Sequence, residues 1–485
     1  MKTLGELFEK YTLTKEEKQI KITNLQHNSK LCTQNSLFFC IKGTQVNGEN
    51  YVSEAIKNGA VAIVTENEIK NISVTQIIVK NIRSEISICA NKFYNSANKL
   101  KIIGVTGTNG KTTITYMLKN ILKYAGKKVG LIGTNEIVIG NKHIESNLTT
   151  PDPIELHKIF SEMVKSNIEW VVMEVSAHAI ALNKIDGIMF EYGIFTNCTQ
   201  DHLDYFKDMM HYEQTKISYL TKKYCKNAVV NADSETGRII ARTSNIKKCA
   251  TYGIDNPSNC FALNIYQNLS TCVFTVNAFD DVFEIKLKMG GEHNIYNALS
   301  AIATAKLIGI SSEDIVKGLN KFKSPNGRYN LIKNSLKATI ILDFAHTPDA
   351  IKKMFEAVKP FKNNRIITVF GATGNRDKLK RGIMGSIIEE NTDIFYLTSD
   401  NPDNEDPLDI ANQVLSGVKD KNKVKIILDR AKCIKNCIFE VQKSDIVLIL
   451  GKGTENYQIY KGIKNPYSDK VEIENALSLR KEKNE

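Results

Sequence analysis

The chain lacks any hydrophobic run long enough to cross a membrane. Its longest apolar runs, such as residues 445–450, have the length of buried strands. The opening residues, MKTLGELFEKY, include acidic side chains and lack both an apolar core and a small-residue cleavage site, so they do not read as a signal peptide. We therefore expect a cytoplasmic protein with no membrane span.

Paired cysteine motifs and basic blocks are missing too. The ten cysteines are irregularly spaced, and no pair of C-x-x-C motifs exists, which argues against zinc and favours reduced cysteines acting as small hydrophobic residues. The net charge of +12 comes mostly from lysines spread along the chain. Because no dense Lys/Arg block or recognition motif accompanies this charge, we expect a solvated surface that helps to attract an anionic small molecule, and no nucleic-acid partner.

The length and apolar content are sufficient for several domains. A chain of 485 residues with 42% hydrophobic and 24% charged residues predicts two or three globular domains. Strand-like runs alternate with helical stretches from residue 35 onward, which is typical of sheets with crossover helices. We predict an α/β protein of three domains: a small N-terminal α/β domain (1–99), a central P-loop domain with a parallel sheet (100–328) and a C-terminal Rossmann-like domain (329–485).

A glycine-rich stretch, GVTGTNGKTT at residues 104–113, follows a strand-like run and precedes a helical pattern. It departs from the strict G-x-x-x-x-G-K-[ST] pattern because Val105 stands where the first glycine belongs. Glycines there let backbone N–H groups approach phosphate oxygens, and Lys111 can reach the outer phosphates. A hydroxyl of Thr112 or Thr113 can bind magnesium. The stretch therefore predicts a nucleotide triphosphate site, against the alternative of a tight turn with an incidental lysine.

Further motifs follow in order along the chain. They are TTPDP (149–153), MEVSAHA (173–179), FTNCTQDHLDYF (195–206), HYEQTK (211–216), GEHNIYNALSA (291–301), DFAHTPDA (343–350), GATGNRDKLKR (371–381), DNPDNEDP (400–407) and GKGTENYQ (451–458). Together with the glycine loop they resemble the Mur ligases, and most closely the MurE type, which adds the third stem residue to UDP-N-acetylmuramoyl-L-alanyl-D-glutamate. That family tolerates a non-glycine residue at the Val105 position. The resemblance covers nearly the whole chain.

The resemblance implies an ATP-dependent acid–amino-acid ligase of peptidoglycan synthesis, and thus of cell-wall formation, cell shape and division. The family phosphorylates a carboxylate to an acyl phosphate, which the amine of the incoming amino acid attacks. Bringing a triphosphate to a carboxylate requires cations, so Mg²⁺ is an expected cofactor. Three domains around one site also predict closure on binding, in a chain we expect to be monomeric.

Site residues carry over from the motifs. The implied metal ligands are Thr112, Glu174, His202 and Lys216, the last carbamylated by carbon dioxide so that a cation becomes an anion; Lys111, Glu174, His202 and Lys216 are the implied catalytic residues. Carbamylation needs a neutral amine, so burial or a nearby cation should lower the pKa of Lys216. The implied ATP-binding residues are Gly107, Thr108, Asn109, Gly110, Lys111, Thr112, Thr113, Asn297, Arg328 and Asp343, with His346 beside them.

The implied UDP-sugar site lies in the N-terminal domain and at the edge of the central one. Its residues are Ser29, Thr149, Thr150, Ser176 and Lys184. Here the chain departs from the family pattern, because Ala177 replaces a serine, Leu182 a glutamine and Lys184 an arginine. A lysine can still meet a phosphate, but without the bidentate fork of arginine.

The implied amino-acid site belongs to the C-terminal domain. Its residues are Arg376, Asp400, Asn401, Asp403, Gly451 and Glu455. In enzymes that use meso-diaminopimelate the motif reads D-N-P-R, and the arginine pairs with the far carboxylate. Asp403 stands at that position here, and two facing carboxylates repel each other by on the order of 1–4 kcal/mol. We therefore predict a dibasic amino acid such as L-lysine.

Other interpretations stay open at this point. The departures fit a diaminopimelate-adding enzyme with an altered pocket, or a related ligase that acts on another acidic substrate. A nucleotide-binding regulator without catalysis is a third alternative, but the retained Lys111, Glu174, His202 and Lys216 disfavour it. A nucleic-acid-binding role would depend on charge alone.

Overall fold

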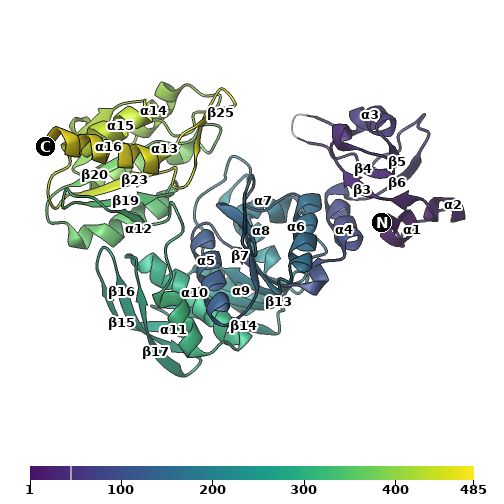
Figure 1. Cartoon of the computed structure of the whole chain (residues 1–485), viewed down its shortest axis with the longest axis horizontal. Coiled ribbons are helices and arrows are strands. Elements are labelled where there is room, and N and C mark those ends of the chain that lie inside the picture. The colour runs from purple at the N-terminus through teal and green to yellow at the C-terminus, as the bar shows by residue number, and fades with distance from the viewer. Residues whose placement is uncertain (44–45, 485) are drawn as a thin grey trace.

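The computed structural model describes residues 1–43 and 46–484. The chain forms three lobes in chain order, with the N-terminal lobe at one end, the C-terminal lobe at the other and the central lobe between them (Figure 1). This confirms the predicted α/β architecture of three domains, while the limits placed at 99/100 and 328/329 stay predictions. Within the described residues, no helix is both long and apolar enough to span a membrane.

The N-terminal domain is built on a four-stranded parallel sheet in the order β3-β4-β5-β6. Its strands are β3 (Asn24–Gln26), β4 (Ser36–Phe39), β5 (Ala60–Thr65) and β6 (Thr75–Ile78), preceded by the pair β1 (Lys2–Thr3) and β2 (Lys21–Ile22). Its helices are α1 (Leu4–Leu7), α2 (Lys15–Lys18), α3 (Val52–Lys57) and α4 (Ile82–Tyr94), with 3₁₀ turns at Ser29–Leu31, Gly48–Tyr51 and Ala97–Lys99.

The central domain carries an eleven-stranded sheet in the order β10-β9-β8-β11-β7-β12-β13-β14-β15-β16-β17. Its strands are β7 (Lys101–Thr106), β8 (Val129–Ile132), β9 (Glu136–Ile139), β10 (Lys142–Glu145), β11 (Trp170–Glu174), β12 (Phe190–Phe195), β13 (Cys225–Asn231), β14 (Lys248–Gly253), β15 (Cys260–Gln267), β16 (Cys272–Ala278) and β17 (Asp281–Leu287). The middle strands run parallel, as predicted. The strands at both edges pair antiparallel, which the sequence reading did not anticipate.

Helices cover both faces of this sheet. They are α5 (Lys111–Tyr124), α10 (Glu292–Ile308) and α11 (Ser312–Asn320) on one face, and α6 (Pro153–Lys165), α7 (Ala177–Ala181), α8 (Met209–Tyr219) and α9 (Glu235–Thr243) on the other. Strand β7, which ends at the glycine loop, lies between β11 and β12. Because parallel strands end at the same edge, the loops that follow these three strands open into one region.

The C-terminal domain is a six-stranded sheet in the order β18-β19-β23-β20-β21-β22, parallel except at β18. Its strands are β18 (Asn330–Ile332), β19 (Thr339–Asp343), β20 (Ile366–Phe370), β21 (Ile394–Leu397), β22 (Val424–Ile426) and β23 (Ile446–Leu450), followed by the hairpin β24 (Tyr457–Tyr460) and β25 (Ile463–Pro466). Its helices are α12 (Pro348–Val358), α13 (Leu379–Asn391), α14 (Pro407–Leu415), α15 (Arg430–Glu440) and α16 (Asp469–Asn484), with 3₁₀ turns at Lys359–Phe361 and Lys421–Lys423.

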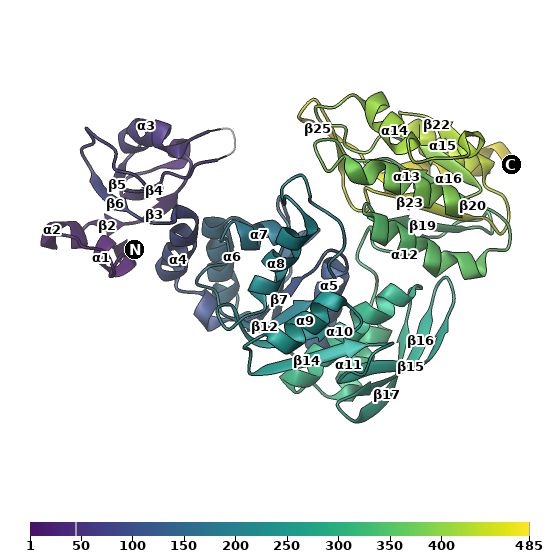
Figure 2. The same ribbon diagram turned by 180° about the vertical axis from the view of Figure 1, so that it is seen from behind.

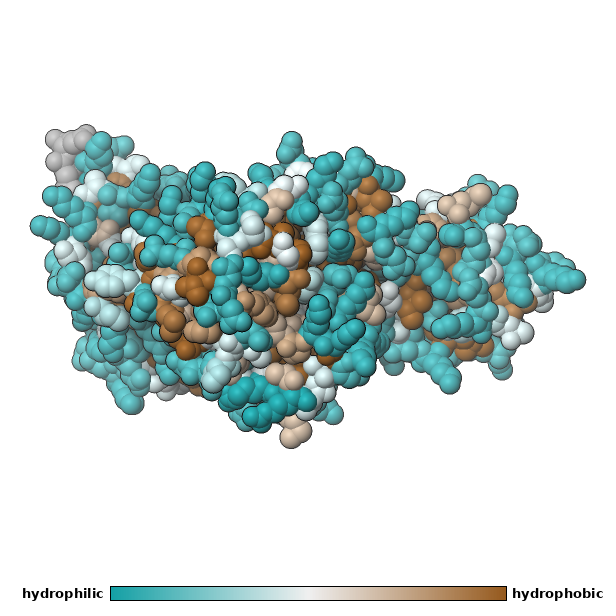
Figure 3. All heavy atoms as spheres, turned by 90° about the horizontal axis from the view of Figure 1, so that it is seen from below, coloured by the Kyte–Doolittle hydropathy of each residue, from teal (hydrophilic) through white to brown (hydrophobic). Residues whose placement is uncertain are grey.

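Helix α4 fastens the N-terminal domain to the central domain. It packs against α6 and donates hydrogen bonds from Ser84, Ser87 and Asn91 to the segment 184–187 of the central domain. Figure 2 shows this joint from behind, with the C-terminal domain on the opposite side of the central one. The face seen in Figure 3 is largely hydrophilic, with apolar side chains gathered in groups between the polar ones.

Candidate active site

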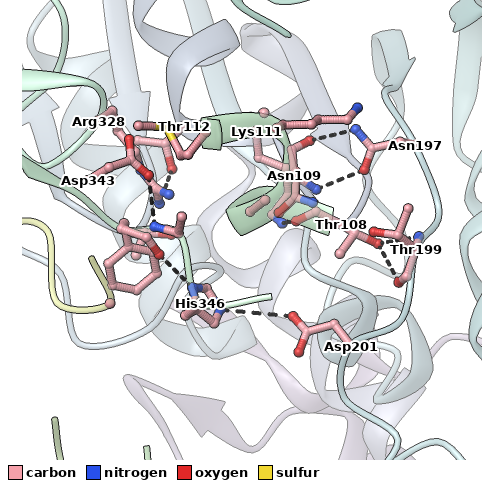
Figure 4. Close-up of a pocket in the computed structure, with 18 of the residues that line it drawn as sticks. Thr108, Asn109, Lys111, Thr112, Asn197, Thr199, Asp201, Arg328, Asp343 and His346 are labelled. Carbon is pink, nitrogen blue, oxygen red and sulfur yellow. Dashed lines mark hydrogen bonds and ion pairs between the residues drawn. The ribbon is translucent and has the colours of Figure 1, made fainter. Parts of the chain in front are cut away.

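A cavity of about 900 Å³ opens between the central and C-terminal domains. The glycine loop and the ends of β11 and β12 line one side of it, and the loops after β19, β20, β21 and β23 line the other. Figure 4 shows the loop residues Thr108, Asn109, Lys111 and Thr112 together with Arg328, Asp343 and His346, and Thr112 lies next to Arg328. Both domains therefore contribute to a single site at the carboxyl ends of their parallel strands.

Two glycines give the loop its shape. Gly107 has a φ of +143°, and a Cβ there would lie 1.8 Å from the hydroxyl oxygen of Thr196. Gly110 has a φ of +91° and directly precedes α5, where a Cβ would lie 2.5 Å from Asn297 Oδ1. Only glycine fits both positions without displacement. The loop thus brings backbone N–H groups and the N-terminus of α5 to the cavity, an arrangement suited to phosphate.

Neighbouring strand ends hold the loop in place. The backbone N–H of Asn109 donates to Asn197 Oδ1 at 2.9 Å, and Thr196 Oγ1 donates to the Asn109 carbonyl at 2.7 Å. Lys111 Nζ donates to the carbonyls of Gly107 and Thr108, at 2.9 Å each. Burial lowers the pKa of Lys111. The lysine is folded onto its own loop, where a phosphate oxygen can take over its hydrogen bonds.

Glu174, the last residue of β11, is fixed through both carboxylate oxygens. Oε1 accepts from Thr112 Oγ1 at 3.0 Å and from the Thr134 N–H at 2.8 Å, while Oε2 accepts from Thr134 Oγ1 at 3.1 Å. The side chain is 1% exposed and lines the cavity. Glu174 and Thr112 therefore present a carboxylate and a hydroxyl side by side.

His202 reaches the cavity from the loop after β12. Its φ of +57° is uncommon for a residue with a side chain, and such conformations gather at functional sites. The ring nitrogen Nδ1 is buried and has no hydrogen-bond partner. Burial lowers the pKa of His202 to about 3, so the neutral imidazole has a lone pair available.

Lys216, on α8, is fully buried and does not line the cavity. Its Nζ has no hydrogen-bond partner and lies 3.7 Å from the centroid of the Tyr212 ring, whose hydroxyl meets Thr108 of the loop at 3.3 Å. Burial, assisted by the charge of Lys111, lowers the pKa of Lys216 to about 7. A lysine with a partly neutral amine thus lies just behind the wall of the site.

The donor set fits a hard cation such as Mg²⁺. Thr112 and Glu174 supply oxygen atoms, and His202 has an unpartnered nitrogen. Within the described residues, no three His, Cys, Asp or Glu side chains gather into a metal cage. Magnesium commonly combines few protein ligands with substrate phosphate oxygens, so a sparse protein set beside a phosphate loop suits it.

Two further groups come from the C-terminal side: Arg328, in the segment that joins the two domains, and Asp343, the last residue of β19. Arg328 donates to Thr112 Oγ1 at 3.2 Å and lies over the Phe344 ring. Asp343 accepts from the backbone N–H groups of Tyr329 and Ala345, at 2.6 and 2.8 Å, and burial raises its pKa. The carboxylate thus fastens the joining segment to the end of β19, while Arg328 reaches the phosphate loop.

The predicted UDP-sugar residues are only partly brought together. Thr149 lines the cavity; Thr150 is buried beside it and donates to the Glu174 carbonyl at 2.9 Å. Ser176 caps α7. Lys184 pairs with Asp152 at 2.7 Å, and Ser29 lies apart in the N-terminal domain, donating to Glu54 at 2.5 Å.

The predicted amino-acid residues all line the C-terminal side of the cavity. Lys452, buried beneath them, donates to Asp400, Asn401 and Glu455 at 3.3, 2.9 and 2.8 Å. Burial and the neighbouring Asp400 raise the pKa of Glu455. Arg376 has no hydrogen-bond or ion-pair partner among the described residues, so one free cation stands among several carboxylates.

Sequence reasoning missed several residues at this site. Thr134 holds Glu174, Lys452 organises the amino-acid side, and Asp201 pairs with Lys380 across the domains at 2.9 Å. Asp201, Lys380 and Lys452 lie within stretches that the sequence had singled out, whereas Thr134 lies outside all of them. The one signal in the sequence that could have indicated Thr134 is its position just after a predicted strand, where ligand-binding loops begin.

Taken together, fold and cavity define an enzyme that holds a nucleotide phosphate chain against a second substrate. Sequence comparison agrees along the chain: the Mur ligase family catalytic domain matches residues 21–102, the Mur ligase middle domain 105–305 and the Mur ligase glutamate ligase domain 327–453. The chain belongs to the Mur ligase family and is an ATP-dependent amide ligase.

Individual relatives match over nearly full length. The UDP-N-acetylmuramoyl-L-alanyl-D-glutamate–2,6-diaminopimelate ligase 1 of Clostridium acetobutylicum is 39% identical over 476 residues, 97% of each chain. The ligase of the same kind from Alkaliphilus oremlandii is 40% identical over 444 residues, 91% of each. A solved structure of such a ligase superposes with a TM-score of 0.71 at 25% identity, covering 99% of both chains.

Proposed function

We propose that this ligase adds the third amino acid of the peptidoglycan stem to UDP-N-acetylmuramoyl-L-alanyl-D-glutamate. The observation that most supports this proposal is a single cavity, in which the glycine loop lies opposite a cluster of carboxylates around Arg376. The full-length relatives named above, which carry this activity in their names, support the same substrate. Its substrates are small molecules, and the predicted absence of a nucleic-acid partner, the cytoplasmic location and the monomeric state stay predictions.

The reaction joins a carboxylate to an amine. A side-chain carboxylate oxygen of D-glutamate attacks the γ-phosphorus of ATP, and ADP leaves. The amine then attacks the acyl phosphate, a tetrahedral intermediate forms, and inorganic phosphate leaves as the nitrogen loses a proton. Positioning and charge neutralisation supply most of the rate in phosphoryl transfer. Bound Mg²⁺ would neutralise charge on the phosphates and on the carboxylate.

The residues of the cavity divide these tasks. The loop N–H groups and Lys111 hold the phosphates, and Arg328 adds a second cation from the segment that joins the two domains. Thr112, Glu174 and His202 would hold magnesium. Lys216, once carbamylated, would add an anionic oxygen ligand from behind the cavity wall. Thr134 keeps Glu174 aimed at the loop.

The charges on the C-terminal side favour a dibasic amino acid as the third residue. Arg376 can bind the α-carboxylate, and Asp403 and Glu455 can accept from the side-chain ammonium. Asp403 lines the cavity with its carboxylate held by Asn375 Nδ2 at 2.8 Å. A second carboxylate on the amino acid would meet this acidic group instead of a cation.

Diaminopimelate is the second candidate, because the relatives at 39–40% identity carry it in their names. In that case a cationic side chain elsewhere in the pocket must bind the far carboxylate, because residue 403 is an aspartate. The choice between L-lysine and diaminopimelate therefore depends on the side chains around Asp403.

An amino-acid screen separates them. The assay measures phosphate release in the presence of ATP and the UDP-dipeptide. We expect kcat/KM for L-lysine to be about tenfold higher than kcat/KM for meso-diaminopimelate, a factor equivalent to about 1.4 kcal/mol. Asp403→Arg should reverse the preference, and Asp403→Asn should weaken it without reversing it. Faster turnover of diaminopimelate by the unaltered chain would select the second candidate. Turnover only with another acid in place of the UDP-dipeptide would point to a related ligase of different substrate, for which Ala177 and Leu182 are the first residues to examine.

A further inference from the structure

Asp201 lies at the junction of the central and C-terminal domains. It follows β12 in the central domain and is 5% exposed. Its Oδ1 accepts from Nζ of Lys380 at 2.9 Å, and Lys380, on α13 of the C-terminal domain, is itself 7% exposed. His346, on the loop after β19, places Nε2 4.0 Å from Oδ2 (Figure 4). A central-domain carboxylate thus meets two C-terminal groups in a buried position.

Asp201 also touches the next residue, His202, in two ways. Its Oδ1 accepts the backbone N–H of His202 at 3.0 Å, and its Oδ2 lies 3.4 Å from the ring nitrogen Nε2. A carboxylate beside Nε2 favours the proton on that nitrogen and leaves the lone pair on Nδ1, the atom that is buried without a partner. The carboxylate therefore influences both the backbone conformation and the tautomer of His202.

Buried charge makes this contact sensitive to the arrangement of the domains. Truncating one partner of a buried ion pair leaves the other uncompensated, which is costly. A neighbouring contact also joins the two domains: Gln200 Nε2 donates to Asp377 Oδ2 at 3.3 Å. Asp377 Oδ1 in turn accepts from the backbone N–H of Leu379, the first residue of α13, at 2.9 Å. The ion pair is satisfied only while α13 lies against the loop that carries His202.

We propose that Asp201 and Lys380 are positioning residues that couple the approach of the C-terminal domain to the orientation of His202. The inference rests on the proposed function only in treating His202 as a metal-holding residue. Lys380 does not touch the reacting atoms in this role. It fixes Asp201, and Asp201 fixes the imidazole, so the metal site is complete only when the domain that carries the amino-acid pocket is in place.

The test uses Mn²⁺ as the probe, in the presence of a non-hydrolysable ATP analogue, with affinity measured by electron paramagnetic resonance. Lys380→Met keeps the aliphatic stem and removes the charge. We expect it to weaken Mn²⁺ binding about tenfold and to lower kcat by a similar factor, with little change in KM for ATP, because groups that orient metal ligands have effects of this size. Lys380→Arg retains the pair and should bind Mn²⁺ as the unaltered chain does.

A double-mutant cycle gives the sharper criterion. If Asp201 and Lys380 act as one unit, Asp201→Asn combined with Lys380→Met should weaken Mn²⁺ binding no more than Asp201→Asn alone. Lys362→Met is the matched control, because Lys362 pairs with Asp393 inside the C-terminal domain at 2.8 Å and should leave Mn²⁺ affinity unchanged. Additive losses, or Mn²⁺ affinity of Lys380→Met within twofold of the unaltered chain, would overturn the proposal.

Failure of the proposed function has a different signature. It would appear as absence of amino-acid-dependent phosphate release in the unaltered chain. The Mn²⁺ measurement does not need turnover and still reports whether Lys380 influences metal binding at this site.

Discussion

Replacing Lys216 with methionine is expected to lower kcat by about 10³-fold or more, because the variant has no amine to carbamylate and would lose the anionic metal ligand that we propose. Removing bicarbonate and carbon dioxide from the unaltered enzyme should reduce activity, and adding bicarbonate back should restore it. The measurement is phosphate release with the UDP-dipeptide and the preferred amino acid. Lys222→Met, at an exposed lysine just beyond α8, is the matched control and should retain full activity.

The same variant has a readout that does not depend on activity. Because the folded-state pKa of Lys216 is lowered to about 7, the native chain binds fewer protons than the unfolded chain between pH 7 and the ordinary lysine pKa of 10.5. Without carbon dioxide, Lys216 should therefore make the free energy of unfolding rise with pH across this window. Lys216→Met should lack that contribution. Equal pH dependence in both proteins would contradict the lowered pKa of Lys216, and full activity of the variant would remove Lys216 from the mechanism.

Glu174→Gln is expected to lower kcat/KM by about 10²- to 10³-fold, the loss equivalent to about 3–4 kcal/mol of transition-state stabilisation. The substitution keeps the shape of the side chain but removes the charge that, next to the Thr112 hydroxyl, would face a metal ion. Mn²⁺ binding should weaken in parallel, and raised Mg²⁺ should restore part of the rate.

Glu169→Gln is the control for this substitution. Glu169 is exposed and lies just before the start of β11, at the opposite end of the strand from Glu174 and the site. It should behave as the unaltered enzyme. If Glu174→Gln kept the Mn²⁺ affinity of the unaltered enzyme, Glu174 would not hold the metal. The hydrogen bonds that it accepts from Thr134 would then serve only to stabilise the fold.

The sequence predicted those parts of the site that follow from local rules. A strand, a glycine-rich turn and a helix starting at Lys111 place the phosphate loop without knowledge of any distant contact. The depressed pKa expected for Lys216 also agrees with its burial. Alternating strands and helices were sufficient to predict three α/β domains.

Features that depend on pairing between distant segments could not be predicted in this way. The antiparallel strands β15, β16 and β17 extend the central sheet, and nothing in their local pattern says which edge they join. The Asp201–Lys380 pair joins residues 179 positions apart. Lys216 was expected among the groups facing the ligands, but the packing of Tyr212 places it behind the wall.

The proposed reaction holds a triphosphate beside a carboxylate so that the acid itself is phosphorylated. Its most direct test is the fate of oxygen-18 placed in the side-chain carboxylate of the D-glutamyl residue of the UDP-dipeptide. After turnover with ATP and the preferred amino acid, the inorganic phosphate should carry one oxygen-18 atom for each amide bond formed, as mass spectrometry can measure. Phosphate without the label, from a reaction that still forms the amide, would contradict the account.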